Sequence, residues 1–158
     1  MADVIRLDRT DKRILELLQQ DGSLSNLQLA EQVGLSASPC SRRVKALEES
    51  GIIEGYRAHL NAKQLGLSLM ALISISMDRH TPERFENFEA ILRDCPQVLE
   101  CYLITGQTAD YVVKVLVRDM DDFQQFLLGT LTRIEGVSGV HSSFVMRKVL
   151  DRTRIALD

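Results

Sequence analysis

Polar and basic residues that could contact nucleic acid lie together in one short segment: Ser36, Ser38, Ser41, Arg42, Arg43 and Lys45. In the same segment Cys40, Val44 and Leu47 recur at spacings of four and three, which predicts a helix with an apolar inner face. An arginine fork can donate two hydrogen bonds to guanine, whereas serine and lysine more often contact phosphates. We expect Arg42 to reach base edges and Arg43 to lie nearer the DNA backbone. The alternative is a solvated helix face with a few basic residues.

A second short helix is expected directly before this one. Ser25 is a candidate N-cap, and Gln28 follows at the spacing of a capping box. Gly34 stands where a helix commonly ends in the left-handed conformation. The expected inward residues of this helix are Leu27, Ala30 and Val33. Two helices joined by such a tight turn are typical of a DNA-reading helix-turn-helix.

Flanking elements complete a first domain over residues 1–63. A helix from about Asp8 to Gln20 has apolar residues on one side that can bury the other two helices. Residues 52–60 combine β-branched and turn residues, which predicts a short ribbon, the wing of a winged helix-turn-helix.

The remaining residues, 64–158, predict a βαββαβ pattern and therefore an α+β, ferredoxin-like domain. Strands are expected over residues 67–77, 98–105, 111–117 and 140–149, with helices opening at Thr81 and at Met120. Two helices on one face of a four-stranded sheet leave the other face uncovered. A second copy of the chain is the usual cover, so a homodimer is expected.

A polar loop between the two middle strands could be a ligand site. It contains Thr105, Gly106, Gln107, Thr108, Asp110 and Tyr111. On the residues alone, ordinary turn chemistry is the simpler interpretation, because aspartate and glycine are turn residues in their own right.

The chain resembles the leucine-responsive regulator and asparagine regulator (Lrp/AsnC) family of bacterial and archaeal transcription factors over nearly its whole length. The likeness is carried by residues 7–11, 14–15, 25–26, 29–30, 33–36, 38–40, 43–44, 47–48 and 51–53. The serine, proline and cysteine of residues 38–40, which enter the recognition helix, are its most specific part.

The resemblance implies that the second domain is an effector-binding (RAM) domain, with a small-molecule pocket at an interface between dimers. The loop of residues 105–111 would line it together with Ser142, Ser143 and Phe144 of the last strand. Backbone groups could hold an amino acid's carboxylate, and Asp110 could attract its ammonium group. This chain has one residue more than the usual family spacing between Gly106 and Asp110. The resemblance also implies dimers that assemble to an octamer, a tetramer of dimers.

Composition and charge fit this picture. The chain has 158 residues and a net charge of −3, but residues 1–64 hold nine basic and nine acidic residues, so the whole deficit lies in the second half. A neutral DNA-binding module predicts modest affinity per protomer and a need for several modules. There is no membrane-length apolar run or signal segment, so we expect a cytoplasmic, nucleoid-associated protein. Cys40, Cys95 and Cys101 include no CxxC pair, which favours apolar packing over zinc or disulfides.

We therefore expect a sequence-specific transcriptional regulator that binds double-stranded DNA and is modulated by an amino-acid effector, with no catalytic residues, metal or cofactor. His59, His80 and His141 lack metal-ligand spacing, and no nucleophile motif or phosphate loop is present. Two alternatives stay open. One is an architectural protein that compacts DNA with little sequence preference. The other is a metabolite-binding or enzymatic ferredoxin-like module.

Overall fold

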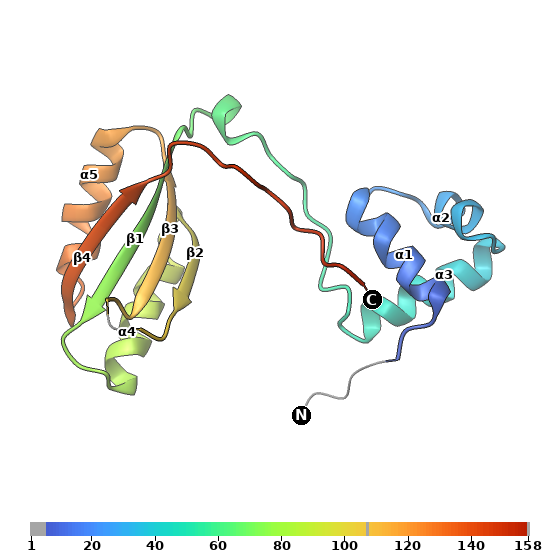
Figure 1. Ribbon diagram of the computed structural model, residues 1–158, viewed down its shortest axis with the longest axis horizontal. Helices are drawn as coiled ribbons and strands as arrows, with labels where there is room; N and C mark the ends of the chain where they lie inside the picture. The colour runs from blue at the N-terminus through green and yellow to red at the C-terminus, as the bar shows by residue number, and fades with distance from the viewer. Residues whose placement is uncertain (1–5, 107, 158) are drawn as a thin grey trace. The chain divides into compact units, whose positions relative to one another are not determined.

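The computed structural model describes residues 6–106 and 108–157. The chain divides into two compact units (Figure 1). Unit 1 comprises Met1–His59 together with Leu150–Asp158, and unit 2 comprises Leu60–Val149. The sequence led us to expect contiguous domains of residues 1–63 and 64–158. The structure differs because the C-terminal segment contacts the helices of unit 1, as described below.

Unit 1 contains three helices: α1 (Arg9–Gln20), α2 (Asn26–Val33) and α3 (Ala37–Glu49). Asp8 caps α1 in a capping box with Asp11, and Ser25 caps α2 in a capping box with Gln28. The three helices enclose one apolar core, whose buried residues are Ile14, Leu15, Leu17, Leu29, Ala30, Cys40, Val44 and Leu47. This arrangement confirms the helix-turn-helix and its inward face on α3.

The turn between α2 and α3 has the predicted geometry. Gly34 has φ 69° and ψ 35°, a left-handed conformation that glycine adopts without a Cβ penalty. The amide of Leu35 then donates to the carbonyl of Ala30 at 2.9 Å and closes the turn. Ser36 occupies the N-cap of α3, although its side chain makes no capping hydrogen bond. The hydroxyl of Ser36 is thus not committed to the helix end.

Two expectations for unit 1 are wrong. Leu27 was expected to point inward, but its side chain is 61% exposed. At about 100° per residue, the face centred on Leu29, Ala30 and Val33 leaves Leu27 on its flank. The expected ribbon over residues 52–60 contains no strand, since no second segment pairs with it among the described residues. Ile52 and Ile53 instead pack against the helical core.

Unit 2 has the expected βαββαβ order. Its elements are β1 (Leu69–Met77), α4 (Pro82–Arg93), β2 (Val98–Leu103), β3 (Tyr111–Val117), α5 (Met120–Gly129) and β4 (Val137–Phe144), with short 3-10 helices η1 (Ala62–Leu65) and η2 (Leu131–Arg133). The four strands form one antiparallel sheet in the order β2-β3-β1-β4. This is the ferredoxin-like topology.

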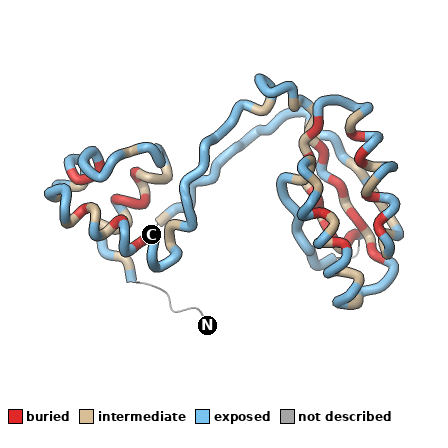
Figure 2. The backbone as a smooth tube through the Cα atoms, turned by 180° about the vertical axis from the view of Figure 1, so that it is seen from behind, coloured by how far each residue is buried: buried red, intermediate tan, exposed pale blue. Residues whose placement is uncertain are grey.

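Both long helices of unit 2 cover the same face of the sheet (Figures 1 and 2). Alternate residues of β1 and β3 are buried beneath them, in a core that includes Ile73, Val113, Phe88 and Phe123. The opposite face carries the exposed Leu72 and a cross-strand ion pair between Lys114 and Glu100 at 2.8 Å. One chain therefore leaves that face of the sheet without a covering layer.

The last strand begins and ends earlier than residues 140–149. It starts at Val137, directly after the left-handed turn at Gly136 (φ 95°). It ends at Phe144, which pairs with Ala71 near the start of β1. The amide of Val145 still donates to the carbonyl of Met70 at 2.9 Å, and β1 begins one residue earlier, at Leu69, so β4 ends where its partner strand ends.

Candidate DNA interface and effector site

The outer face of α3 presents a cation without an internal partner. Arg42 is exposed and makes no hydrogen bond or ion pair with any other described residue. Lys45, one turn further along, is 73% exposed and lies 3.5 Å from Glu49. Ser36 and Ser38 are exposed at the start of the helix. The N-terminal half of α3 thus combines uncommitted hydroxyls with a free guanidinium, which suits phosphate and base-edge contacts.

Ser41 joins α3 to α2. Its hydroxyl accepts a hydrogen bond from the side-chain amide of Asn26 at 3.3 Å, and Ser41 is only half-buried. Asn26 was not singled out from the sequence, because nothing in the spacing shows that the first residue of α2 meets the second turn of α3. The contact fixes the crossing of the two helices next to the predicted reading face.

Arg43 has internal partners that the sequence did not reveal. Its guanidinium donates to Asp8 at 2.6 Å and to Asp11 at 2.7 Å. Hydrogen bonds with Asp11 and Asp8 raise the pKa of Arg43. The amide of Asp11 and then Arg43 lower the pKa of Asp8. Arg43 therefore holds the start of α1 against α3, and its charge is largely neutralised within the unit.

Tyr56 holds the segment after α3 in place. Its hydroxyl donates to Glu48 at 3.0 Å, and burial followed by this bond raises the pKa of Tyr56 to about 12. A Cβ at Gly22 would lie 3.3 Å from the Tyr56 ring, so the ring sits against the turn after α1. No pattern in the sequence indicates a separate role for Tyr56. Its contacts fix the chain at the end of the recognition helix.

In unit 2, the loop between β2 and β3 carries most of the predicted effector residues. Thr105, Gly106 and Thr108 are exposed, and Gln107 lies outside the described residues. A Cβ added at Gly106 would meet no other atom within 4 Å. The exposed loop leaves backbone groups accessible to a ligand.

Asp110 is already occupied by two internal contacts. One carboxylate oxygen accepts from the amide of Met77 at 2.7 Å, and the other lies 2.7 Å from Nε2 of His80. An ammonium group at Asp110 would therefore have to compete with the Met77 amide and His80 for the carboxylate oxygens. In this chain Asp110 joins the start of β3 to the end of β1, and His80 is its partner rather than an isolated loop residue.

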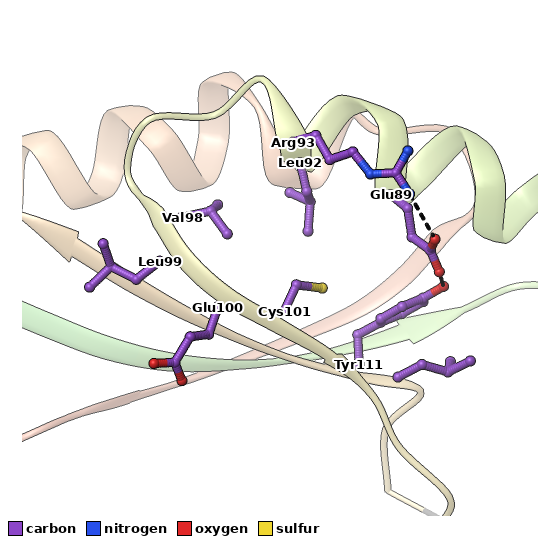
Figure 3. A pocket seen from close by; sticks show the side chains of 9 residues that line it. Glu89, Leu92, Arg93, Val98, Leu99, Glu100, Cys101 and Tyr111 are labelled. Carbon is purple, nitrogen blue, oxygen red and sulfur yellow. Dashed lines mark hydrogen bonds and ion pairs between the residues drawn. The ribbon is translucent and has the colours of Figure 1, made fainter. Parts of the chain in front are cut away.

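Tyr111 points away from the loop, beneath α4 (Figure 3). It is 1% exposed, and its hydroxyl donates to Glu89 at 2.9 Å. The Phe88 ring lies 4.7 Å from the Tyr111 ring, centroid to centroid. Burial, followed by the bond to Glu89, raises the pKa of Tyr111. Tyr111 is therefore a core residue of unit 2.

A shallow pocket of about 420 Å³ lies between α4 and β2 (Figure 3). Tyr111 and Glu89 line one part of it, and Leu99 and Cys101 line another. Cys101 is exposed on the edge strand, so the expectation of apolar burial fails for this cysteine although it holds for Cys40. Neighbouring atoms still partly desolvate the thiol, and this desolvation, followed by the nearby Glu89, raises the pKa of Cys101, which disfavours a reactive thiolate.

The three predicted residues of β4 do not share one face of the sheet. Ser142 and Phe144 pair with Ile73 and Ala71, which point toward the helices. The Phe144 ring makes an edge contact with Phe123 at 4.9 Å. Ser143 pairs with Leu72 and belongs to the open face. A single chain therefore does not gather Ser142, Ser143 and Phe144 around one ligand.

Among residues 6–106 and 108–157, no group of three histidine, cysteine, aspartate or glutamate side chains could hold a metal ion. Within the same part of the chain, no helix has the length and apolar character needed to cross a membrane.

The helix-turn-helix and the ferredoxin-like sheet are the two parts of a known class of transcription factors. The family sequence model described as winged helix-turn-helix DNA-binding matches residues 7–54. The model described as Lrp/AsnC ligand binding domain matches residues 70–155. The chain belongs to the Lrp/AsnC family of transcriptional regulators, and it is a regulator rather than an enzyme.

Individual relatives are similar to this chain along almost their entire length. The Bkd operon transcriptional regulator of Pseudomonas aeruginosa is 42% identical over 147 residues, covering 93% of this chain and 95% of the relative. The leucine-responsive regulatory protein of Salmonella typhimurium is 40% identical over 151 residues, covering 96% and 92%. A Neisseria meningitidis transcriptional regulator, solved as an L-Met complex, is 40% identical with a TM-score of 0.92, covering 97% and 98%. The solved structure of AsnC from E. coli is 27% identical with a TM-score of 0.86, covering 95% and 99%.

Proposed function

We propose that this protein is a sequence-specific regulator that binds double-stranded DNA and whose DNA affinity or assembly is shifted by an amino acid. The observation that carries the proposal is the outer face of α3, where Arg42 is exposed and unpaired among the described residues while Arg43 is tied to α1. The ion pairs of Arg43 with Asp8 and Asp11 hold α3 against the start of α1. A free guanidinium on a helix held in this way is suited to the major groove.

The contacts divide the predicted DNA residues by role. Arg42 reads base edges, and Ser36, Ser38 and Lys45 contact phosphates, because these four are exposed on or beside the first turns of α3. Ser41 positions α3 against α2 through Asn26. Arg43 positions α3 against α1 and contributes only a weak field at the DNA backbone.

The effector is an α-amino acid that binds at the loop of residues 105–111. Support comes from the exposed loop, from the ligand-binding family of unit 2 and from the L-Met complex of the Neisseria meningitidis relative. With Asp110 and Tyr111 engaged internally, the loop backbone supplies the contacts from this chain. A second copy supplies the rest, which requires an assembly of dimers, up to an octamer. Such a protein works in the cytoplasm, on nucleoid DNA.

A binding titration tests the proposal. The full chain is titrated onto DNA from upstream of its own gene and onto random DNA, at two salt concentrations, with and without each proteinogenic amino acid. Selective affinity that one amino acid shifts supports the proposal, since an effector must bind one state better than another to change anything. Weak, salt-sensitive and unselective binding that no amino acid changes would overturn it in favour of an architectural DNA-compacting protein.

A further inference from the structure

The C-terminal segment is part of the DNA-binding unit although it follows the effector unit in the sequence. Residues up to Val149 belong to unit 2, whereas Leu150–Asp158 belong to unit 1. The chain therefore passes between the two units twice, once at the start of unit 2 and once after β4. The second passage begins five residues beyond Phe144, the last residue of β4.

A glutamine of α1 holds the backbone of this segment. Oε1 of Gln19 accepts from the amide of Ile155 at 2.6 Å, and Nε2 of Gln19 donates to the carbonyl of Ile155 at 3.1 Å. One carboxamide thus satisfies both backbone groups of one residue, as a neighbouring strand would. The Ile155 side chain is 71% exposed, so the contact recognises the main chain rather than this side chain.

Apolar packing secures the segment two residues later. Leu157 is half-buried and packs against the core of unit 1. The segment also forms one wall of a pocket of about 440 Å³, with Leu15, Leu18 and Ile53 among the residues that line the other side. Nearer the start of the segment, Nε2 of His59 lies 3.7 Å from a carboxylate oxygen of Asp151. Backbone and apolar contacts therefore hold the segment at two points, Ile155 and Leu157.

We propose that residues 153–157 are a docking segment for the groove between α1 and residues 52–56, and that this docking is the route by which β4 acts on the DNA-binding unit. The proposal rests on the proposed function, since it assigns a path to the effector response. When the segment is docked, it connects the two units a second time, in addition to the linker that precedes unit 2. The fraction of molecules in which it is docked depends on the position of the end of β4, from which the segment extends. An effector that favours one arrangement at β4 must then shift docking, and the shift is reciprocal.

Trypsin tests the docking itself, because Arg152 and Arg154 place two cleavage sites at the segment. Gln19→Ala removes the clamp on Ile155, and Leu157→Ala removes the apolar anchor. Each variant should be cleaved after Arg154 about fivefold faster than the wild type under native conditions, since cleavage follows the population of the open form. Gln20→Ala and Leu150→Ala are matched controls at exposed positions and should be cleaved at the wild-type rate. Equal rates in all five proteins would overturn the docking.

Operator titrations of the same proteins test the route. In Gln19→Ala and Leu157→Ala, the ratio of DNA dissociation constants with and without the responding amino acid should fall toward one, while both controls keep the wild-type ratio. Faster cleavage together with a wild-type ratio of DNA dissociation constants would show that docking is not the route by which β4 acts on the DNA-binding unit. If the wild type itself binds no operator selectively, the proposed function is wrong, and so is the route from β4 to the DNA-binding unit. The cleavage rates would still show whether the segment docks. L-methionine and L-leucine are the first amino acids to use.

Discussion

The two units differ in how much of a site one chain provides. In unit 1 four of the six predicted reading residues are exposed at or near the start of α3: Ser36, Ser38, Arg42 and Lys45. Arg42 is left without a partner among the described residues, whereas Ser41 and Arg43 contact α2 and the start of α1. In unit 2 the charged and aromatic residues predicted for the effector are used internally, since Asp110 contacts Met77 and His80, and Tyr111 contacts Glu89.

This difference shows where each function resides. A recognition helix needs only one surface with uncommitted donors, and the three helices of one unit 1 are sufficient to position it. The residues predicted for the effector divide between two faces of a sheet, so we expect a pocket formed from them to include backbone of the exposed loop and residues of a second copy. We therefore expect one chain to present a complete DNA-contacting surface, whereas we expect the effector site to be complete only in the assembly.

Replacing Arg42 gives the largest effect on DNA binding. Arg42→Ala should weaken binding to the preferred operator by about 1–3 kcal/mol, because a bidentate base contact is lost, and should relax selectivity at one base pair. Fluorescence anisotropy on operator and random DNA measures both. Lys45→Ala is the control and should weaken binding to both DNAs alike, with a shallower salt dependence. Equal losses on both DNAs for Arg42→Ala would show that Arg42 only touches phosphate.

Replacing Tyr111 tests the claim that this residue belongs to the core of unit 2. Tyr111→Phe should lower the stability of unit 2 by about 1–2 kcal/mol, because Glu89 loses the donor to its carboxylate. Urea unfolding measures the change. Tyr102→Phe is a matched control, since the Tyr102 hydroxyl also donates to a glutamate but the residue is exposed, and its effect should be much smaller. Loss of amino-acid binding in Tyr111→Phe without loss of stability would place Tyr111 in the effector site instead.

Arg43 should matter for stability more than for DNA contact. Arg43→Ala should destabilise unit 1 by about 0.5–1 kcal/mol, as is typical of a partly exposed ion pair. The contribution also depends on pH, because the pKa of Asp8 is lowered from its ordinary value of 3.8. In the unfolded chain Asp8 takes up its proton near that value, and in the folded chain only at lower pH. The stabilisation is therefore complete above pH 3.8 and declines as the pH falls below it.

Thermal unfolding of wild type and Arg43→Ala across pH 3 to 7 measures this dependence, and the stability gap should narrow at the acid end. Arg42→Ala serves as the control on the same helix and should show no gap at any pH. A constant gap for Arg43→Ala would mean that its packing, rather than its charge, stabilises unit 1.

The smallest effect is expected at His80. His80→Ala removes one exposed contact to Asp110 and should change stability by only about 0.5 kcal/mol, because the amide of Met77 still holds the carboxylate. Asp110→Ala removes both contacts and should cost more. Amino-acid affinity that survives His80→Ala but falls in Asp110→Ala would show that the loop depends on the Met77 contact. An equal fall in amino-acid affinity in both variants would show that the His80 contact matters as much as the Met77 contact.

Local patterns explain which features could be predicted. Ser25, Gln28 and Gly34 specify helix ends through bonds within a few residues, and all three have the expected roles. The run of apolar, mostly β-branched residues over β3 likewise predicts its bounds, Tyr111–Val117. The ribbon over residues 52–60 was predicted from residue type, but a strand exists only where another segment pairs with it.

Contacts between distant residues explain what could not be predicted. Arg43 contacts Asp8 and Asp11, which lie more than thirty residues away in the sequence. The spacing of apolar residues predicts helices and strands, but it does not predict ion pairs between distant residues. The pairing of Gln19 with Ile155 spans 136 residues. Burial of Tyr111 and the internal contacts of Asp110 change the expected roles of both residues, because a side chain that is bound within the fold is less available to a ligand.

The most direct test of the difference between the units is calorimetric titration of the wild type with L-methionine and L-leucine over a range of protein concentrations, with the assembly state followed by sedimentation velocity. If effector binding belongs to the assembly, the amino acid should bind well only where dimers associate, and its affinity should fall as the protein is diluted into smaller species. An amino-acid affinity that stays the same from assembled to dissociated protein would contradict this, since one chain would then hold the whole effector site.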